Sequence, residues 1–291
     1  MSEIEVDGRA LRFSNLDKVL WPRAGFTKGE LVDYYRRVAA ALLPHLAERP
    51  VTLARFPDGV DRYGWYQTNC RGRPDWLPTR RIRDQEYCLL NDLPALLWAA
   101  NMGAIELHPF LARSDRLHEP EVVVFDLDPG PPAGIVECCR VALRLRDTLA
   151  AERLASFPKT SGSLGLHVYV PLNSPAGYGR TKPFARLVAR TLAEQHPDSV
   201  VDEMPKRLRA GKILLDWGQN DAAKSTVAPY SLRAMERPTV STPLRWEEVE
   251  HVADERRSDL LAFSPRDVLN RLETLGELFE PVLTLKQALP G

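Results

Sequence analysis

VVVFDLDP, residues Val122–Pro129, is the stretch from which the rest of the sequence can be interpreted. Its leading apolar residues are rich in Val and end in Phe, which predicts a strand buried on both faces. Because side chains alternate along a strand, Asp126 and Asp128 are expected on one side while Leu127 points into the core. The Pro and Gly residues that follow break the strand, which leaves the two carboxylates at an open edge.

The paired carboxylates at this strand end indicate a cation site. Asp126 and Asp128 repel each other and are expensive to desolvate, and a divalent cation between them removes both costs. Ligation by oxygen alone favours Mg²⁺ or Mn²⁺. Asp216 ends another apolar run, KILLDW, and would complete the minimal carboxylate set for two metals and in-line nucleotidyl transfer. For a D-x-D motif by itself, the commoner interpretation is a strand end whose acids cap the next turn or helix.

Length and composition describe an ordinary globular chain. It has 291 residues, of which 27% are charged and 44% hydrophobic, and this suits one large domain or two small ones. The formal net charge is zero, which excludes a uniformly basic DNA-coating surface but not a local basic groove. With no membrane-spanning apolar run and no signal peptide, we expect a cytoplasmic protein. Its cysteines are then expected to be reduced, namely Cys70, Cys88, Cys138 and Cys139.

The N-terminal part of the chain contains candidate DNA contacts. Thr27 and Glu30 predict a capping box at the start of a helix. Two lysines in or beside the preceding loop could hold a phosphate with free backbone N–H groups, although from the residues alone an ordinary solvated loop is the preferred interpretation. The residues concerned are Asn15, Lys18 and Lys28.

Aromatic residues and a histidine occur between this helix and the acidic strand. Trp65 and Tyr66 lie near several arginines, so they are either a base-stacking platform with phosphate contacts or core aromatics flanked by surface arginines. His108 ends an expected strand over residues 104–108, and a histidine at such a place is more often structural.

The run TSGSLG, residues 160–165, predicts a flexible turn suited to phosphate oxygens. It supplies the hydroxyls of Ser161 and Ser163, with Gly162 between them, and leads into a strand on which His167 could donate to a phosphate. Neither a Walker A motif nor a dinucleotide-binding fingerprint occurs. Further cations follow that could bind a triphosphate or a template backbone: Arg207, Arg209, Lys212 and, in a possible closing segment, Arg233.

These motifs occur in one order: DLD, S-G-S-x-G-x-H, a strand ending in Asp, A-P-Y-S-L-R and V-S-T-P-L. In this order the chain resembles the archaeo-eukaryotic primase superfamily. More closely, it resembles the polymerase domain of bacterial ATP-dependent DNA ligase D and its stand-alone relatives, the bacterial primase-polymerases. The resemblance implies an α/β (α+β) primase-polymerase fold, in which an RRM-like antiparallel catalytic sheet packs with an N-terminal α/β module. A single catalytic domain over residues 1–291 is expected.

The resemblance also implies roles for individual residues. Two Mn²⁺ or Mg²⁺ ions would be bound by Asp126, Asp128 and Asp216. The implied nucleotide contacts are His108, Ser161, Gly162, Ser163, His167, Arg209, Gln219 and Arg233. The implied DNA contacts are Asn15, Lys18 and Lys28 at a 5′-phosphate, which reverses the solvated-loop interpretation, and Trp65 and Tyr66 against a base.

The chain departs from the ligase D pattern in several places. Leu164 stands where many of those domains carry a lysine in the serine-glycine loop, and Lys159 is a candidate to compensate. The basic residue after P-V-T is displaced to Arg55, and the F-Q-K run reads Tyr66-Gln67-Thr68. These differences point toward the stand-alone branch and bear on triphosphate affinity and end joining.

The sequence therefore predicts a template-dependent repair polymerase that adds one or a few nucleotides, preferably ribonucleotides, to 3′ ends at short gaps or breaks. Its expected partners are gapped or broken DNA with a 5′-phosphate, NTP or dNTP substrates and a separate ATP-dependent DNA ligase in trans. The protein is expected in the bacterial cytoplasm, associated with the nucleoid and not with a membrane. Two alternatives stay open. One is a metal-dependent nuclease or phosphoesterase that also uses His108 and His167. The other is a non-catalytic binder of 5′-phosphorylated DNA ends.

Overall fold

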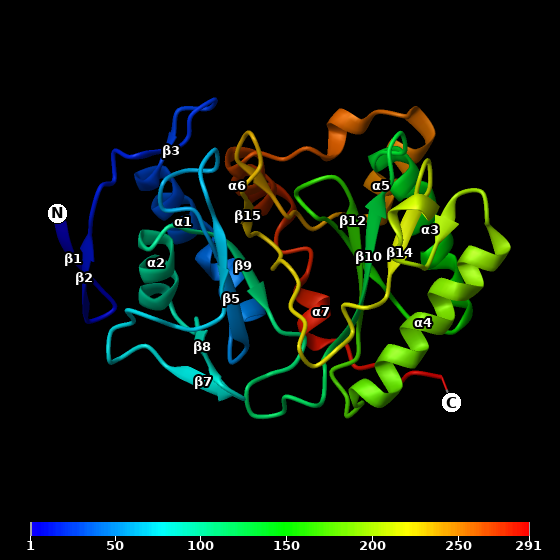
Figure 1. Ribbon diagram of the computed structural model, residues 1–291, viewed down its shortest axis with the longest axis horizontal. Helices are drawn as coiled ribbons and strands as arrows, with labels where there is room; N and C mark the ends of the chain where they lie inside the picture. The colour runs from blue at the N-terminus through cyan, green and yellow to red at the C-terminus, as the bar shows by residue number, and fades with distance from the viewer. Residues whose placement is uncertain (1, 291) are drawn as a thin grey trace.

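The computed structural model describes residues 2–290, and two sheet-containing modules lie side by side in it (Figure 1). The N-terminal module, blue to cyan, contains the helices α1 (Lys28–Leu46) and α2 (Leu93–Asn101). The second module, green to yellow, is built around β10 (Val122–Pro129), the strand predicted from the acidic motif. The arrangement agrees with the expected catalytic sheet and N-terminal α/β module.

The sheet of the N-terminal module is centred on β5 (Pro50–Arg55). β9 pairs with one edge of β5, β6 and β8 pair with the other, and β7 extends the sheet beyond β8. All these pairs are antiparallel, and α1 packs against α2 and β9. The outer strands are β6 (Trp65–Gln67), β7 (Thr79–Ile82), β8 (Gln85–Leu89) and β9 (Ala104–Pro109).

The second sheet has the strand order β11-β12-β10-β14-β13. Its pairs are antiparallel except for β13 and β14, which run parallel. The acidic strand β10 is therefore central, with β12 on one side and β14 on the other. The other strands are β11 (Phe157–Thr160), β12 (Leu166–Pro171), β13 (Val200–Val201) and β14 (Ile213–Asp216).

The two faces of this second sheet are covered differently. Phe125 and Leu127 point into a core formed with the helices, which are α3 (Ile135–Ala151), α4 (Tyr178–Gln195) and α5 (Trp246–Glu255). On the opposite face, Val122 and Val124 pack against Phe279 and α7 (Glu280–Thr284). Asp126 and Asp128 continue this second face beyond the cover that Phe279 and α7 provide.

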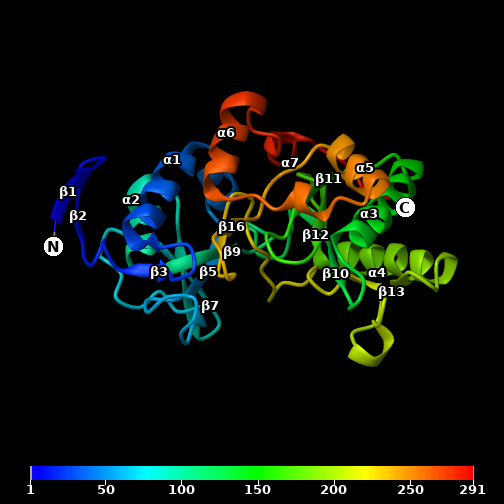
Figure 2. The ribbon, with the colours of Figure 1, turned by 90° about the horizontal axis from the view of Figure 1, so that it is seen from above.

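Segments that follow β14 connect the two modules (Figure 2). The hairpin of β15 (Leu232–Arg233) and β16 (Thr239–Val240) contacts β9, and α6 (Pro265–Leu275) contacts α1. By contrast, α5 packs on α3 in the second module. The C-terminal part of the chain therefore builds much of the interface between the modules.

Local signals near the N-terminus are confirmed. The Thr27 hydroxyl accepts from the Glu30 N–H, and the Glu30 carboxylate accepts from the Thr27 N–H, which forms the capping box of α1. Two hairpins precede this helix: β1 (Ser2–Val6) with β2 (Arg9–Phe13), and β3 (Val19–Trp21) with β4 (Phe26–Thr27). None of the helices within residues 2–290 has the length and apolar character needed to cross a membrane.

The expectation that all cysteines are reduced is wrong. Cys70 forms a disulfide with Cys88, at a Cα–Cα distance of 5.1 Å, whereas Cys138 and Cys139 are free and buried. The pairing follows from the tertiary structure, because the Cys70 N–H donates to the carbonyl of Glu86 (2.6 Å) and so draws the loop after β6 against β8. A sequence separation of 18 residues with no C-x-x-C motif does not reveal such a pair.

Candidate active site

Asp126 lies in a row of polar side chains that crosses the second sheet. The strand register places it opposite His167 of β12 on one side and opposite Asp216 of β14 on the other. Asp128 follows on the same face of β10, since side chains alternate along a strand. The structure therefore brings the predicted aspartates together on one face of the sheet, across its strands β10 and β14, and not at the open edge that the sequence predicted.

The electrostatics of these carboxylates depend on burial and on mutual repulsion. Burial and the charges of Asp126 and Asp216 raise the pKa of Asp128 to about 6. Burial, with a smaller contribution from Asp126, also raises the pKa of Asp216. Burial acts in the same direction on Asp126, but the interaction with His167 and the charges of Lys159 and Arg233 together outweigh it and leave the pKa of Asp126 below the ordinary value. Such a cluster is stabilised by a bound cation.

The donor set fits a divalent cation, although the side chains do not surround a common point. Within residues 2–290, no group of three or more His, Cys, Asp or Glu side chains is arranged to hold a metal ion. Asp126 Oδ1 lies 3.2 Å from His167 Nε2, and the Asp216 carboxylate accepts from the Gly218 N–H (2.7 Å) and from Gln219 Nε2 (3.1 Å). Metal binding would require these carboxylates to turn toward Asp128, and carboxylate oxygen is the donor that Mg²⁺ and Mn²⁺ prefer.

The serine-glycine loop is closed by its first serine. The Ser161 hydroxyl accepts from the backbone N–H groups of Ser163 and Gly165, each at 3.1 Å. Gly162 has φ +73°, and a Cβ there would lie 2.7 Å from the backbone N of Ser241. The loop can therefore pack against the β15–β16 hairpin only with glycine at this position.

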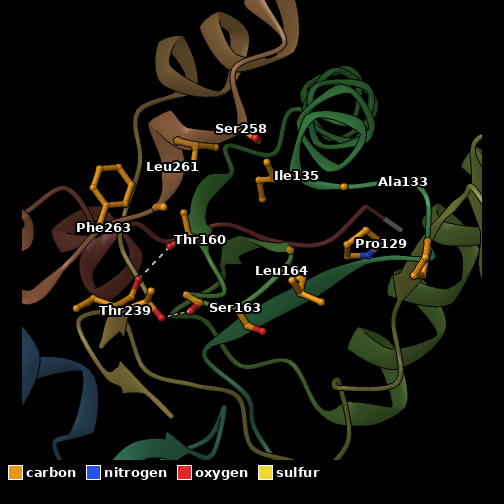
Figure 3. Close-up of a pocket in the computed structure, with 16 residues that line it drawn as sticks. Pro129, Ala133, Ile135, Thr160, Ser163, Leu164, Thr239, Ser258, Leu261 and Phe263 are labelled. Atoms are coloured by element: carbon orange, nitrogen blue, oxygen red, sulfur yellow. Dashed lines mark hydrogen bonds between the residues drawn. The ribbon is translucent and has the colours of Figure 1, made fainter. Parts of the chain in front are cut away.

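A cavity of about 360 Å³ lies beside this loop, between the loop, the start of α3 and the segment around Leu261 (Figure 3). Its lining is mainly apolar, and Leu164, whose side chain is 65% exposed, lies at its border. The predicted compensation by Lys159 is wrong. Lys159 is fully buried, its Nζ donates to Ser241 Oγ (2.6 Å), and so it does not reach the loop surface.

His167 is engaged with the aspartates rather than turned toward the loop. Its Nε2 lies 3.2 Å from Asp126 Oδ1, and its buried Nδ1 has no hydrogen-bond partner in the described part of the chain. Lys159 pairs with His167 in the β11–β12 register and lies with its Nζ 5.6 Å from the ring centroid of Tyr169. Sequence reasoning missed that the charge of the buried Lys159 acts on the site, where it helps to lower the pKa of Asp126.

A second polar cluster joins the modules. The Glu106 carboxylate accepts from His108 Nε2 (2.8 Å) and from the Ala234 N–H (3.0 Å), and it forms an ion pair with Arg233 Nε (3.1 Å). Arg233 Nη1 in turn donates to the carbonyl of Ser161 (2.5 Å). The predicted nucleotide residues His108, Arg233 and Ser161 thus lie in one connected network, and the residue that links them, Glu106, was not predicted.

Arg209 and Gln219 lie close to the aspartates. Arg209 Nη2 donates to the carbonyl of Met204 (2.5 Å), and its charge acts on Asp128. The backbone there is tight, because a Cβ on Gly130 would lie 1.8 Å from the Arg209 carbonyl oxygen. The Gln219 side chain donates a hydrogen bond to the carboxylate of Asp216, a proposed metal ligand, and so orients that carboxylate in this structure.

The N-terminal lysines lie in a tightly turned loop. The Lys28 N–H donates to the carbonyl of Lys18 (2.8 Å), and the Lys18 N–H donates to that of Asn15 (3.0 Å). Lys18 Nζ pairs with Asp58 (2.5 Å), and Lys28 Nζ donates to the carbonyl of Ser14 (2.7 Å). Burial and the charge of Lys18 lower the pKa of Lys28. The structure therefore brings Asn15, Lys18 and Lys28 together, which an ordinary solvated loop does not require.

The aromatic pair is at the surface. The Tyr66 side chain is 64% exposed and meets the ring of His108 edge-on, at a centroid distance of 5.4 Å. Trp65 is half-buried, stacks with Tyr63 at 6.2 Å and has the Arg55 guanidinium over its ring at 5.1 Å. The interpretation as core aromatics is therefore wrong for Tyr66, whose ring is accessible for stacking.

Known proteins are similar to this chain in sequence. The family model described as LigD, primase-polymerase domain, matches residues 27–279. The multifunctional non-homologous end joining protein LigD of Mycolicibacterium smegmatis is 39% identical over 279 residues, which are 94% of this chain and 36% of that protein. The bifunctional non-homologous end joining protein LigD of Bacillus subtilis is 33% identical over 246 residues, 82% of this chain and 39% of that protein. The chain thus spans well under half the length of these relatives.

The fold is shared as well. The solved polymerase domain from Mycobacterium tuberculosis Ligase D in complex with DNA has a TM-score of 0.87 and 35% sequence identity to this chain. The match covers 95% of this chain and 99% of that one. The predicted primase-polymerase fold is therefore confirmed.

Proposed function

The chain belongs to the family of LigD primase-polymerase domains and is a nucleotidyltransferase, and we propose that it is a template-dependent repair polymerase acting at DNA gaps and breaks. In the proposed reaction it adds one or a few nucleotides, preferably ribonucleotides, to a 3′ end that faces a 5′-phosphate. We place this activity in non-homologous end joining, for which the LigD relatives are named. A ligase then has to seal the remaining nick.

The observation that carries the proposal is the row of carboxylates across β10 and β14. Asp126, Asp128 and Asp216 would hold two Mg²⁺ or Mn²⁺ ions, and the repulsion that raises the pKa of Asp128 would then be relieved. When bound, these ions lower the pKa of the primer 3′-hydroxyl and offset the charge of the triphosphate and of the departing pyrophosphate.

The surrounding residues would position the other reactants. The serine hydroxyls of the Ser161–Gly165 loop, with Arg233, would bind the triphosphate. Tyr66 presents an exposed ring on which a base can stack. At the N-terminal loop, a DNA 5′-phosphate would take the place of Asp58 beside Lys18, because a phosphate carries more charge than a carboxylate.

The histidines support a polymerase over a nuclease that recruits them as extra metal ligands. His108 Nε2 is already bonded to Glu106, and His167 Nε2 faces Asp126 from the adjacent strand. Two-metal nucleotidyl transfer needs only the carboxylates and the substrate oxygens. The histidines would therefore remain in the protein network during the reaction.

Primer extension on a gapped duplex with a downstream 5′-phosphate tests the proposal. Wild type and Asp128→Asn would be compared with Mn²⁺ or Mg²⁺ and with NTPs or dNTPs, and Asp147→Asn on α3, an exposed acid paired with Arg146, is the matched control. We expect wild type to extend the primer by copying the template and to favour NTPs. The rate should fall in Asp128→Asn by more than the roughly 10–100-fold that is typical when a residue bonded to a metal ligand is replaced. The rate of Asp147→Asn should equal that of wild type. Equal extension by all three proteins would sink the metal assignment, and absence of extension with 5′-phosphate-dependent binding would favour an end-binding protein.

A further inference from the structure

Glu106 occupies a position that the proposed chemistry does not use. It lies on β9 in the N-terminal module, with only 5% of its surface exposed. Its carboxylate accepts hydrogen bonds from His108 Nε2 (2.8 Å) and from the Ala234 N–H (3.0 Å), and it forms an ion pair with Arg233, whose Nε lies 3.1 Å away. Glu106 and His108 share one face of β9, whereas Arg233 comes from β15, far along the chain. One carboxylate thus holds side chains from two separate segments.

Burial of the Glu106 carboxylate has a desolvation cost that its neighbours must offset. Removing an ionised carboxylate from water is costly unless it is paired and hydrogen-bonded, and apolar replacements of buried ion pairs are often as stable. Here the interactions with His108 and Arg233 offset the effect of burial and bring the pKa of Glu106 to about 2. The carboxylate is therefore charged at neutral pH and acts only as an acceptor.

The charged Glu106 carboxylate determines which ring nitrogen of His108 carries the proton. Because Glu106 cannot donate, the proton between it and His108 belongs to Nε2 of the ring. Burial, together with the charges of Arg233 and Lys159, lowers the pKa of His108 more than Glu106 raises it, so the ring is neutral near pH 7 and Nδ1 carries a lone pair. No hydrogen bond from residues 2–290 engages that Nδ1, and the exposed ring of Tyr66 lies against His108. Nδ1 is thus the ring nitrogen left for a ligand.

We propose that Glu106 is a positioning residue of the nucleotide site, which sets the Nε2–H tautomer of His108 and at the same time fixes Arg233 against the serine-glycine loop. This rests on the proposed function, because it assumes that His108 and Arg233 contact the incoming nucleotide. Its consequence is specific: Glu106 pre-orients an acceptor atom for a ligand hydroxyl and a cation for phosphate across the junction between the modules. Loss of Glu106 therefore weakens nucleotide binding rather than the chemical step.

A purely structural ion pair is the competing explanation, and the chain offers a matched control for it. Glu121 also joins the modules: its carboxylate pairs with Arg49 and, at 3.0 Å, with Arg113, and its side chain is 15% exposed. Glu121 is bonded to none of the proposed nucleotide residues. Glu121→Gln therefore measures what weakening an inter-module ion pair does by itself.

The first experiment compares Glu106→Gln with Glu121→Gln in the full chain by steady-state primer extension, with thermal unfolding as the stability readout. We expect Glu106→Gln to raise KM for NTP about 10-fold or more while kcat changes by less than about 3-fold, since lost hydrogen bonds to charged groups cost that much in binding. Glu121→Gln should leave KM within about 2-fold, whatever its effect on Tm. Unchanged KM in Glu106→Gln, or an equal rise in both variants, overturns the proposal.

The second experiment does not depend on polymerase activity. Long-range ¹H–¹⁵N NMR of histidine-labelled protein reports the tautomer of each of the six histidines, and His108→Ala identifies the signal of His108. We expect the Nε2–H form in wild type and its loss in Glu106→Gln, whose amide can donate to the ring. A wild-type His108 in the Nδ1–H form refutes the inference even if the enzyme polymerises. If wild type fails to polymerise but shows the Nε2–H form, and NTP shifts the His108 signal, the proposed function fails and the positioning role stands.

Discussion

Replacing Gly162 with alanine tests whether the serine-glycine loop is locked against the β15–β16 hairpin. Gly162 has φ +73°, a conformation that residues with a Cβ rarely adopt. The added Cβ would lie 2.7 Å from Arg233 Cγ, from the backbone N of Ser241 and from the backbone C of Val240. The Arg233 side chain can move, whereas the backbone of the hairpin cannot do so without displacing the loop.

The expected cost combines two contributions. A left-handed backbone with a Cβ costs roughly 1–2 kcal/mol, and overpacking against atoms that cannot relax adds about 1–3 kcal/mol. The free energy of unfolding should therefore fall by roughly 2–5 kcal/mol. In a chain of this size, 1 kcal/mol lowers Tm by about 2–4 °C, so the change is easily measured.

Gly8→Ala is the control that separates the two contributions. Gly8 also has a positive φ, of +76°, in the turn between β1 and β2, but a Cβ there meets nothing within 4 Å. Chemical denaturation of both variants gives the backbone cost from Gly8→Ala and the contact cost from the difference. Only Gly162→Ala should also raise KM for nucleotide, because its loop is bonded to Arg233.

Equal destabilisation by the two substitutions would refute this reasoning. It would mean that the contacts of the Gly162 loop relax freely and that the loop is not held by the hairpin. Unchanged nucleotide KM together with a large loss of stability would separate the loop from the nucleotide site.

Two further predictions concern stability. The Cys70–Cys88 disulfide closes a loop over a separation of 18 residues, so its reduction should lower the free energy of unfolding by about 3 kcal/mol. In the double variant Cys70→Ser/Cys88→Ser, reductant should have no effect on urea unfolding. A wild type that is insensitive to reductant would show that the thiols are not paired. Burial lowers the pKa of His45, His108 and His167 below 6.5, so the unfolded state binds more protons and stability should fall as pH decreases below about 6.5, by up to about 1.4 kcal/mol per pH unit for each histidine. Denaturation at several pH values should give a smaller slope for His45→Gln than for wild type. A flat wild-type profile would contradict the burial argument.

The sequence predicts well what depends on residues close together along the chain. The strand Val122–Pro129 is apolar on successive positions, so its burial and the common side of Asp126 and Asp128 follow from alternation alone. The Thr27 capping box depends on local hydrogen bonding at the start of a helix, and it too is found as predicted. The order of motifs was sufficient to identify the family, which the comparisons confirm.

Only the tertiary structure decides which distant residues meet. Cys70 and Cys88 pair because a loop is drawn against β8, and Lys159 is buried because its strand places it under the β15–β16 hairpin instead of at the loop surface. The role proposed for Glu106 depends on its ion pair with Arg233, which lies more than a hundred residues further along the chain. Strand alternation and capping are short-range effects that a sequence records directly, whereas the partner of a buried charge is set by how sheets and hairpins pack, and no local pattern encodes that packing.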